Sequence, residues 1–235
     1  MRIVILFVFL VFITNRVSAQ REEIEKKLDE YNIPGDYVVN AMKDGEATYS
    51  FKFRSVTWLP SSNGMEEIVE EGEFNPERPI GERWKILKIN GETPDKKQVN
   101  KFNKAQNTVK NNVNAEIDDN FYRIFEDNDD ELVLSLRFTK ESLPKRYGFL
   151  KECTGLAYID KKEKRLTRIE YNNDYPVKVW NYKATGLALV QHYHYDEREN
   201  KYFISHEEMD IESNYMGKGI SILFDIKYND YEKVK

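Results

Sequence analysis

Hydrophobic and polar residues alternate over several long stretches of the chain. The clearest stretch is 220–228, where the apolar side chains point to one side and Asp225 to the other, and only Leu223 breaks the pattern. One dry and one wet face is typical of strands in an antiparallel sheet. Similar runs with a period of two residues occur at 47–53, 132–138, 167–171 and 187–195.

Clusters of turn-forming residues separate these runs. They lie at 127–130, 160–163, 172–174, 184–186, 197–200 and 214–217. We therefore expect roughly six or seven strands between 121 and 229, joined as sequential hairpins without a helix among them. The segment 41–91 is expected to add about three more strands.

Two segments follow the helical period instead. In 20–31, Ile24, Leu28 and Tyr31 share one face, and a Pro-Gly pair ends the helix after Ile33. A second helix is expected over 94–109. Its cap is Thr93, its first turn holds Pro94, and one side carries Val99, Phe102 and Gln106.

The long sheet must cover its apolar face. The fold class that follows is mainly β with a few helices (α+β), as a curved antiparallel sheet or half-barrel closed by helices. A partly filled concave face would leave an apolar cavity for an acyl chain, whereas a completely filled one would be a solid core. Both use the same residue types, so the pattern leaves both open.

The N-terminus has the features of a secretory signal. Arg2 precedes an apolar run from Ile3 to Ile13, and Val17-Ser18-Ala19 suits signal peptidase. This run is shorter than the roughly 20 residues of a membrane-spanning helix. We expect a signal peptide at 1–19, a single β domain at 20–235 with a loop or sub-boundary near 107–120, and a periplasmic or secreted location.

Charge and cysteine content narrow the function. The net charge is −5, and residues 1–19 contain two arginines and no acid, so the mature chain carries −7. Because the phosphates of nucleic acid require a basic protein face, this acidic charge argues against nucleic acid as a partner. Cys153 is the only cysteine, so no intramolecular disulfide forms. Without a catalytic signature around it, Cys153 reads as a small buried apolar side chain.

The stretch VQHYHYD raises the question of a metal. His192, His194 and Asp196 share one side of a strand, and the opposite side is the greasier one, so the histidines are expected to face outward without a metal. His206 lies on the next strand. It faces His192 if paired residue numbers sum to 398, and it points to the other side if they sum to 397. A hydrolase metal site at His192, His194 and His206 is the less favoured alternative.

Other signs of an enzyme are missing from the sequence. It has no G-x-S-x-G elbow, no H-E-x-x-H motif and no glycine-rich phosphate loop. The acidic runs at 68–74, 127–131 and 206–210 read as solvated carboxylates, and 127–131 as a hairpin turn rather than a calcium loop. We therefore expect neither catalysis nor a cofactor.

The C-terminal half resembles a known superfamily. The run GLAYIDKKEKRLTRIEYNNDYPVKVWNY (155–182) and the closing FDIKYNDYEKVK (224–235) are similar to the C-terminal sheet of the periplasmic lipoprotein carriers, which include LolA, LolB and RseB-type regulators. The resemblance covers about residues 120–235, while the first hundred residues, including GERWKILKINGETP, do not match. It implies a curved half-barrel that binds lipid acyl chains or a lipoprotein without catalysis.

The function expected is therefore that of a non-catalytic periplasmic protein that holds a lipid, a lipoprotein acyl chain or another apolar ligand. Its partners would be that ligand or a lipid-modified protein, with a transient envelope protein as a further partner. The alternative is an interaction or scaffold module with a filled core. The expected ligand-binding residues share the greasy face of two strands: Leu187, Leu189, Tyr193, Tyr195, Ile220, Ile222, Phe224 and Ile226.

Overall fold

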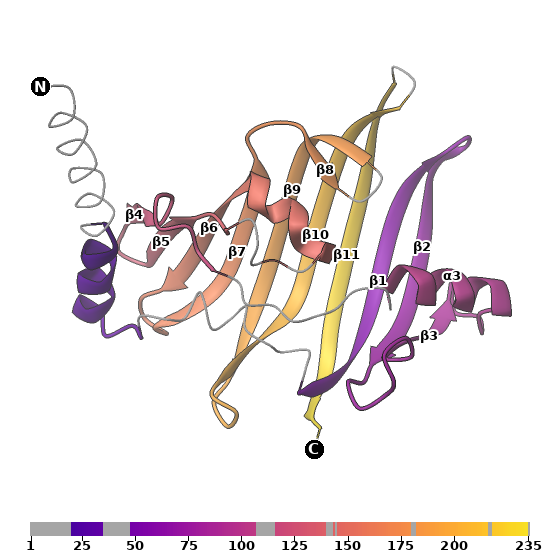
Figure 1. The fold of residues 1–235 in the computed structure, drawn as a ribbon, viewed down its shortest axis with the longest axis horizontal. Helices are drawn as coiled ribbons and strands as arrows, with labels where there is room; N and C mark the ends of the chain where they lie inside the picture. The colour runs from indigo at the N-terminus through magenta and orange to yellow at the C-terminus, as the bar shows by residue number, and fades with distance from the viewer. Residues whose placement is uncertain are drawn as a thin grey trace, which may run out of the picture.

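The computed structural model describes residues 20–34, 48–106, 116–139, 143, 145–179, 182–215 and 218–234. Within these ranges the chain forms one sheet of eleven strands in which every pairing is antiparallel. The mainly β fold class and the open, curved sheet are confirmed (Figure 1). The predicted signal peptide at 1–19 and the segment 107–115 of the predicted loop lie outside the described residues.

The strands follow the predicted alternation closely. Three precede the second helix and eight follow it, where six or seven were expected. They are β1 (Tyr49–Ser61), β2 (Gly64–Phe74), β3 (Trp84–Ile89), β4 (Arg123–Asp127), β5 (Glu131–Leu136), β6 (Cys153–Asp160), β7 (Arg165–Asn173), β8 (Val177–Val179), β9 (Tyr182–Asp196), β10 (Lys201–Tyr215) and β11 (Lys218–Lys233).

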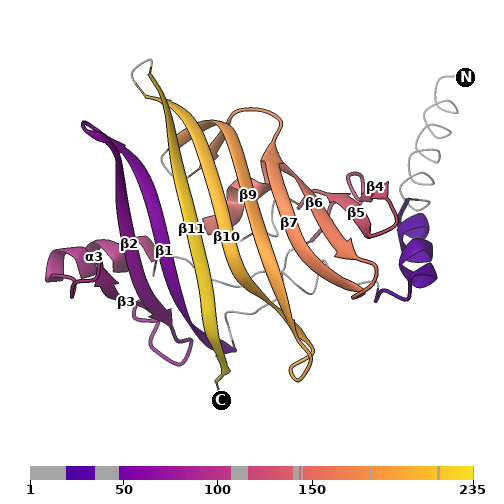
Figure 2. The ribbon, with the colours of Figure 1, turned by 180° about the vertical axis from the view of Figure 1, so that it is seen from behind.

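In the sheet, the last strand lies next to the first one. From β4 to β11 neighbours in sequence are mostly neighbours in the sheet, which confirms the hairpin meander, and short β8 pairs with the start of β9. The last strand, β11, then pairs with β1, and β2 and β3 complete the far edge. The N-terminal strands and the meander are thus one continuous sheet (Figure 2).

The sequence misplaced one turn and missed one helix. Residues 184–186 were predicted as a turn but lie inside β9, because Ala184 pairs with both β8 and β10. No helix was expected after 121, yet η1 (Lys145–Glu152) is a 3₁₀-helix there. Its sequence KRYGFLKE lacks an apolar stripe at the helical period, so pattern reading had no signal for it.

The other two helices lie near opposite ends of the sheet (Figure 1). The predicted N-terminal helix is present at 20–30 and buries Ile24 and Leu28. The second, α3 (Lys96–Gln106), starts later than predicted. Its cap is not Thr93 but Asp95, whose Oδ1 accepts the backbone N–H of Gln98 at 2.8 Å while Gln98 Oε1 accepts that of Asp95.

Two hydrophobic clusters lie side by side along the sheet. The larger one joins the N-terminal helix, η1 and strands β5 to β11, and includes fully buried Leu134, Ile169 and Ile211. The smaller one is rich in aromatic rings and joins α3 to β1, β2 and β3. Its buried members are Phe51, Phe53, Phe74, Trp84, Ile86 and Phe102.

Asp127 ties the N-terminal helix to the turn after β4. Its carboxylate accepts a hydrogen bond from the Tyr31 hydroxyl at 3.0 Å and pairs with Lys161 at 2.6 Å and Lys27 at 3.1 Å. Lys161 Nζ also lies 4.3 Å from the centre of the Tyr31 ring. These bonds, Lys161 first and then Lys27 and Tyr31, lower the pKa of Asp127 from 3.8 to about 2.

This lowered pKa predicts how acid affects stability. A carboxyl with a depressed pKa stabilises the fold above its ordinary value of 3.8, and this contribution is lost as the pH falls toward 2. The stability gap between the wild type and Asp127→Asn should therefore shrink between pH 5 and pH 2, as measured by urea unfolding. Asp129→Asn, in the same exposed turn, is the control. A gap that is independent of pH would contradict this role of Asp127.

In the part of the chain that the structure describes, no helix has the length and apolar character needed to cross a membrane.

Candidate functional site

The face of the sheet that carries η1 is called the inner face, and the opposite face the outer face. Pairing through β10 aligns the predicted ligand-binding residues in rows across three strands. Leu187, Ile211 and Ile222 form one row, and Leu189, Met209 and Phe224 the next. β9 and β11 therefore present their predicted residues on the same side of the sheet.

The eight predicted residues differ in burial. Leu187, Leu189, Tyr193 and Ile222 are buried in the larger cluster, where Ile222 is only 1% exposed. Tyr195, Ile220 and Phe224 are partly buried against that cluster, whereas Ile226 packs against the smaller, aromatic one. The predicted set thus spans the junction of the two clusters, with its most accessible members on β11 and at the end of β9.

A small cavity lies at this junction. It has a volume of about 30 Å³, which is room for one or two water molecules. Its walls come from η1 and from strands β9, β10 and β11, and they are lined by Tyr147, Phe149, Leu189, Glu207, Met209, Phe224 and Ile226. Three of the predicted residues, Leu189, Phe224 and Ile226, therefore border the same space.

The polar centre of the inner face was missed from the sequence. Glu207 is 4% exposed, although the run 206–210 was read as solvated carboxylates. Its Oε1 accepts hydrogen bonds from Gln191 Nε2 at 2.7 Å and from the Tyr147 hydroxyl at 3.2 Å, and its Oε2 accepts one from the Tyr228 hydroxyl. The sequence did contain a signal for this burial. Glu207, Met209 and Ile211 are spaced two residues apart, so Glu207 points to the same side of β10 as two apolar residues.

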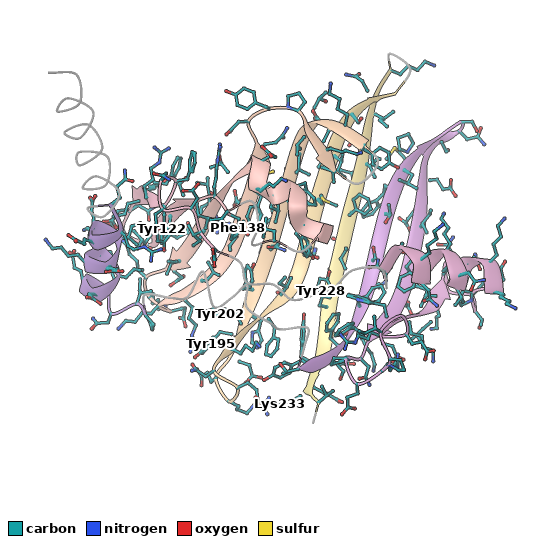
Figure 3. The ribbon with its side chains drawn as sticks, viewed as in Figure 1. Tyr122, Phe138, Tyr195, Tyr202, Tyr228 and Lys233 are labelled. Atoms are coloured by element: carbon teal, nitrogen blue, oxygen red, sulfur yellow. The ribbon has the colours of Figure 1, made fainter. Side chains whose placement is uncertain are left out.

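This network continues along the inner face to Tyr193, and the position of Tyr228, its donor on β11, is labelled in Figure 3. The Tyr193 hydroxyl donates to Gln191 Oε1 at 3.1 Å. Burial, together with the nearby Glu207, raises the pKa of Tyr193 well above its usual value. The hydroxyl consequently stays protonated and remains a donor. Buried polar groups that are all hydrogen-bonded in this way fix one arrangement of the side chains around them.

A second, more open pocket lies beside the turn between β9 and β10. It has a volume of about 210 Å³ and a mainly polar lining. Within it, Glu199 Oε2 accepts hydrogen bonds from the Tyr49 hydroxyl at 2.8 Å and from Lys233 Nζ at 2.9 Å. Its lining residues are Tyr49, Asp196, Arg198, Glu199, Phe203, Tyr231 and Lys233. An apolar ligand would find few partners there.

His192 and His194 lie on the outer face, as predicted, and His206, whose face the sequence left open, lies there as well. β9 and β10 pair with a sum of 397 at Tyr193 and Ile204, and with a sum of 398 at His192 and His206. Both registers that the sequence left open are therefore present. Ser205 is the extra residue of the bulge between them, and its hydroxyl donates to the His192 carbonyl at 3.2 Å.

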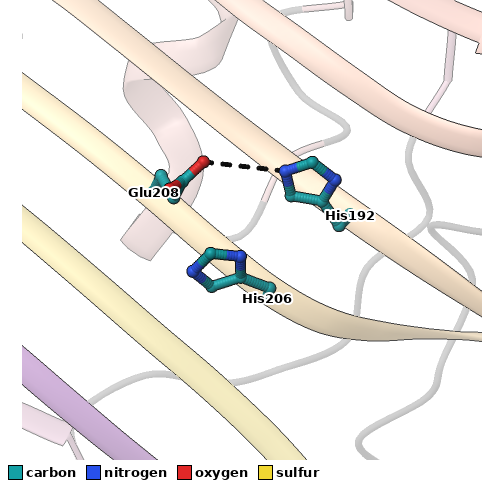
Figure 4. Close-up of side chains that lie close together, drawn as sticks. All are labelled: His192, His206 and Glu208. Atoms are coloured by element: carbon teal, nitrogen blue, oxygen red, sulfur yellow. Dashed lines mark ion pairs between the residues drawn. The ribbon is translucent and has the colours of Figure 1, made fainter.

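The alternative metal site of His192, His194 and His206 is wrong in one residue, because Glu208 and not His194 lies beside the other two. Ligand atoms of His192, His206 and Glu208 lie within 4.8 Å of one another, while His194 is not part of this group (Figure 4). His192 Nε2 is 3.6 Å from Glu208 Oε2, and His206 Nε2 is 3.0 Å from Asp225 Oδ2. Glu208, two residues after His206 on the same face, takes the third position.

Cys153 has the surroundings of a core residue rather than of a nucleophile. It is 1% exposed, and its sulfur donates weakly to the Phe149 carbonyl at 3.6 Å. Burial raises the pKa of the thiol to about 12. At neutral pH the reactive thiolate is therefore scarce.

No family model and no curated protein matches the chain. Among solved structures, a LolA superfamily protein from Nitrosomonas europaea is similar with a TM-score of 0.38 and 11% identity, over 84% of this chain and 90% of the other. An outer membrane lipoprotein-sorting protein domain from Vibrio parahaemolyticus has a TM-score of 0.37 and 11% identity, over 91% and 93%. A DUF1329 family protein from Desulfovibrio piger has a TM-score of 0.36 and 11% identity, over 86% and 92%.

Proposed function

We propose that the protein binds an apolar or lipid-bearing ligand on the inner face of its sheet and performs no catalysis. The observation that carries the proposal is the cavity between η1 and strands β9 to β11. It is bordered by Leu189, Phe224 and Ile226, which were singled out from the alternation alone. Pockets for small molecules combine such apolar walls with a few placed polar groups, and Glu207 supplies the polar group here.

Binding requires η1 to move. A cavity of about 30 Å³ is far smaller than the several hundred Å³ of a typical ligand pocket. Tyr147 and Phe149 form its cover, and the Tyr147 hydroxyl donates a hydrogen bond to Glu207 on the sheet at 3.2 Å. Displacing this short helix would expose partly buried Phe224 and Ile226 without disturbing the pairing of β9, β10 and β11. A site of this kind opens as the ligand enters.

The setting of the proposed activity is the periplasm or another secreted compartment. The signal-like segment 1–19 supports this compartment. The mature charge of −7 disfavours nucleic acid as a partner. The ligand is a lipid, an acyl chain of a lipid-modified protein or another apolar molecule, and a transient envelope protein would deliver or receive it.

A second function, an interaction module with a filled core, is favoured by a different observation. Leu187, Leu189, Tyr193 and Ile222 are at most 9% exposed without any ligand present. In this second function, the packed inner face would support the outer face, which would contact the partner. The two functions differ in whether the inner face accepts a probe.

The test is binding of a fluorescent fatty acid to delipidated protein, together with native mass spectrometry of freshly purified protein. The carrier function predicts saturable probe binding at micromolar concentration and a co-purified lipid. If no lipophilic probe binds and no lipid co-purifies, the interaction module is correct and the carrier proposal is wrong.

Two alanine variants on β11 should show whether a residue belongs to the wall of a cavity or to a packed core. Ile222→Ala should lower the free energy of unfolding by about 2–5 kcal/mol, as for a buried core residue. Phe224→Ala should cost less than the roughly 3–5 kcal/mol of a fully buried ring, because Phe224 is partly exposed and borders a cavity. Phe224→Ala should also change the affinity for the fatty-acid probe. A full core-sized cost together with unchanged probe binding would exclude Phe224 from the site.

A further inference from the structure

We propose that His192, His206 and Glu208 form a binding site for one divalent transition-metal ion on the outer face of the sheet. The site is separate from the inner-face cavity and does not depend on the proposed ligand. Ligand atoms of these three residues already lie within 4.8 Å of one another. They come from two strands whose pairing is defined residue by residue.

The backbone holds the two histidines in place. His192 and His206 are direct partners across β9 and β10, and residues that face each other in this way have Cβ atoms only about 5 Å apart. Their rings are nearly parallel, with centres 5.4 Å apart. The Ser205 bulge brings His206 to the outer face, and Glu208 follows on the same face of β10.

The donor set selects the kind of metal. Two imidazole nitrogens and one carboxylate oxygen suit Zn²⁺, Ni²⁺ or Cu²⁺, whereas Ca²⁺ and Mg²⁺ require a shell of oxygens. Two ligands of a tetrahedral zinc ion lie about 3.3 Å apart. His192 Nε2 and Glu208 Oε2 are at 3.6 Å, so a small side-chain rotation brings them to this spacing. The remaining coordination position faces solvent, where water can fill it.

Asp225 acts as a positioning residue. Its Oδ2 lies 3.0 Å from His206 Nε2. When Nε2 donates this hydrogen bond, Nδ1 is the ring nitrogen that keeps a lone pair, and the ring orientation is fixed. A carboxylate behind a histidine in this way is the usual support of a metal ligand.

The charges around the site favour a cation. Glu208 and Asp225 contribute carboxylates directly beside the histidines. Two cationic residues flank the pair, Arg168 opposite His192 and Lys227 opposite His206. The Arg168 guanidinium is engaged elsewhere, by Glu170 at 2.8 Å and Glu131 at 3.0 Å. Two carboxylates therefore lie directly beside the histidines, while the Arg168 guanidinium is paired with other carboxylates.

The experiment is isothermal titration of Zn²⁺ into protein expressed without a polyhistidine tag. The wild type should bind one equivalent saturably, and His192→Gln and His206→Gln should each lose this binding. His194→Gln is the matched control, because it is exposed, on the same strand and face, and outside the cluster. Asp225→Asn should weaken binding about 10- to 100-fold, as expected for the support of a ligand.

Thermal unfolding supplies the second measurement. Each variant should melt close to the wild type without metal, because the histidines are on the outer face. Added Zn²⁺ should raise the melting temperature of the wild type and of His194→Gln only. Absence of saturable binding to the wild type, or equal loss in His194→Gln, would overturn the proposal. Failure of fatty-acid probe binding would leave the metal result unaffected, since the two sites lie on opposite faces.

Discussion

Replacing Glu207 with alanine is expected to lower the free energy of unfolding by about 3–5 kcal/mol. The carboxylate is buried and accepts hydrogen bonds from Gln191, Tyr147 and Tyr228. Its removal takes this acceptor away from all three donors at the centre of an apolar face. The penalty for unsatisfied buried groups then adds to the cost of the new cavity. Urea unfolding followed by circular dichroism would measure the change.

Two further variants identify the cause of this loss. Glu207→Gln keeps the shape and one acceptor oxygen, so it should cost about 1–2 kcal/mol. Glu212→Ala, on the same strand but exposed, should change the stability by less than about 0.5 kcal/mol. If Glu207→Ala were as mild as Glu212→Ala, the carboxylate would not organise the inner face.

Replacing Gly72 with alanine is expected to cost about 1–3 kcal/mol or more. A Cβ atom at this position would lie 2.5 Å from ring atoms of Phe53 and 2.6 Å from the Lys85 backbone oxygen. The ring belongs to the aromatic cluster of β1 to β3, and the oxygen to the paired strand β3, so neither can retreat freely. The missing side chain is therefore what lets Phe53 lie flat across β2.

Gly219→Ala is the matched control for this prediction. Gly219 also lies in a strand, β11, but a Cβ atom there would meet nothing within 4 Å. Its substitution should leave the melting temperature nearly unchanged, whereas Gly72→Ala should lower it by several degrees. Similar melting temperatures for both variants would show that the Phe53 ring adapts without cost.

The sequence predicted what depends on local pattern. Alternation identified β1, β5, β7, β9 and β11, and the helical period identified the helix at 20–30. It predicted equally well that His192 and His194 face outward, whereas it left the face of His206 open. These features follow from which side of one strand or helix is apolar, which requires no knowledge of neighbours.

What it could not predict depends on contacts between distant residues. The pairing of β11 with β1 closes a loop of more than 150 residues, and nothing in either strand specifies its partner. η1 has no amphipathic period and is held by the inner face that it covers. Glu207 was misread because a charged residue in an apolar phase looks like a solvated one until its donors, Tyr147 and Tyr228, are seen beside it.

The bulge at Ser205 sets which residues of β10 face inward and which face outward, because it absorbs one residue of the strand. Before the bulge, paired numbers sum to 397, and in that register His206 would oppose Gln191 on the inner face. The one inserted residue instead turns His206 and Glu208 outward and Glu207 inward. Loss of a single codon at position 205 would remove only this extra residue, so His206 would follow Ile204 directly and still oppose His192. The inner network and the outer cluster would then keep their faces in a strand without a bulge.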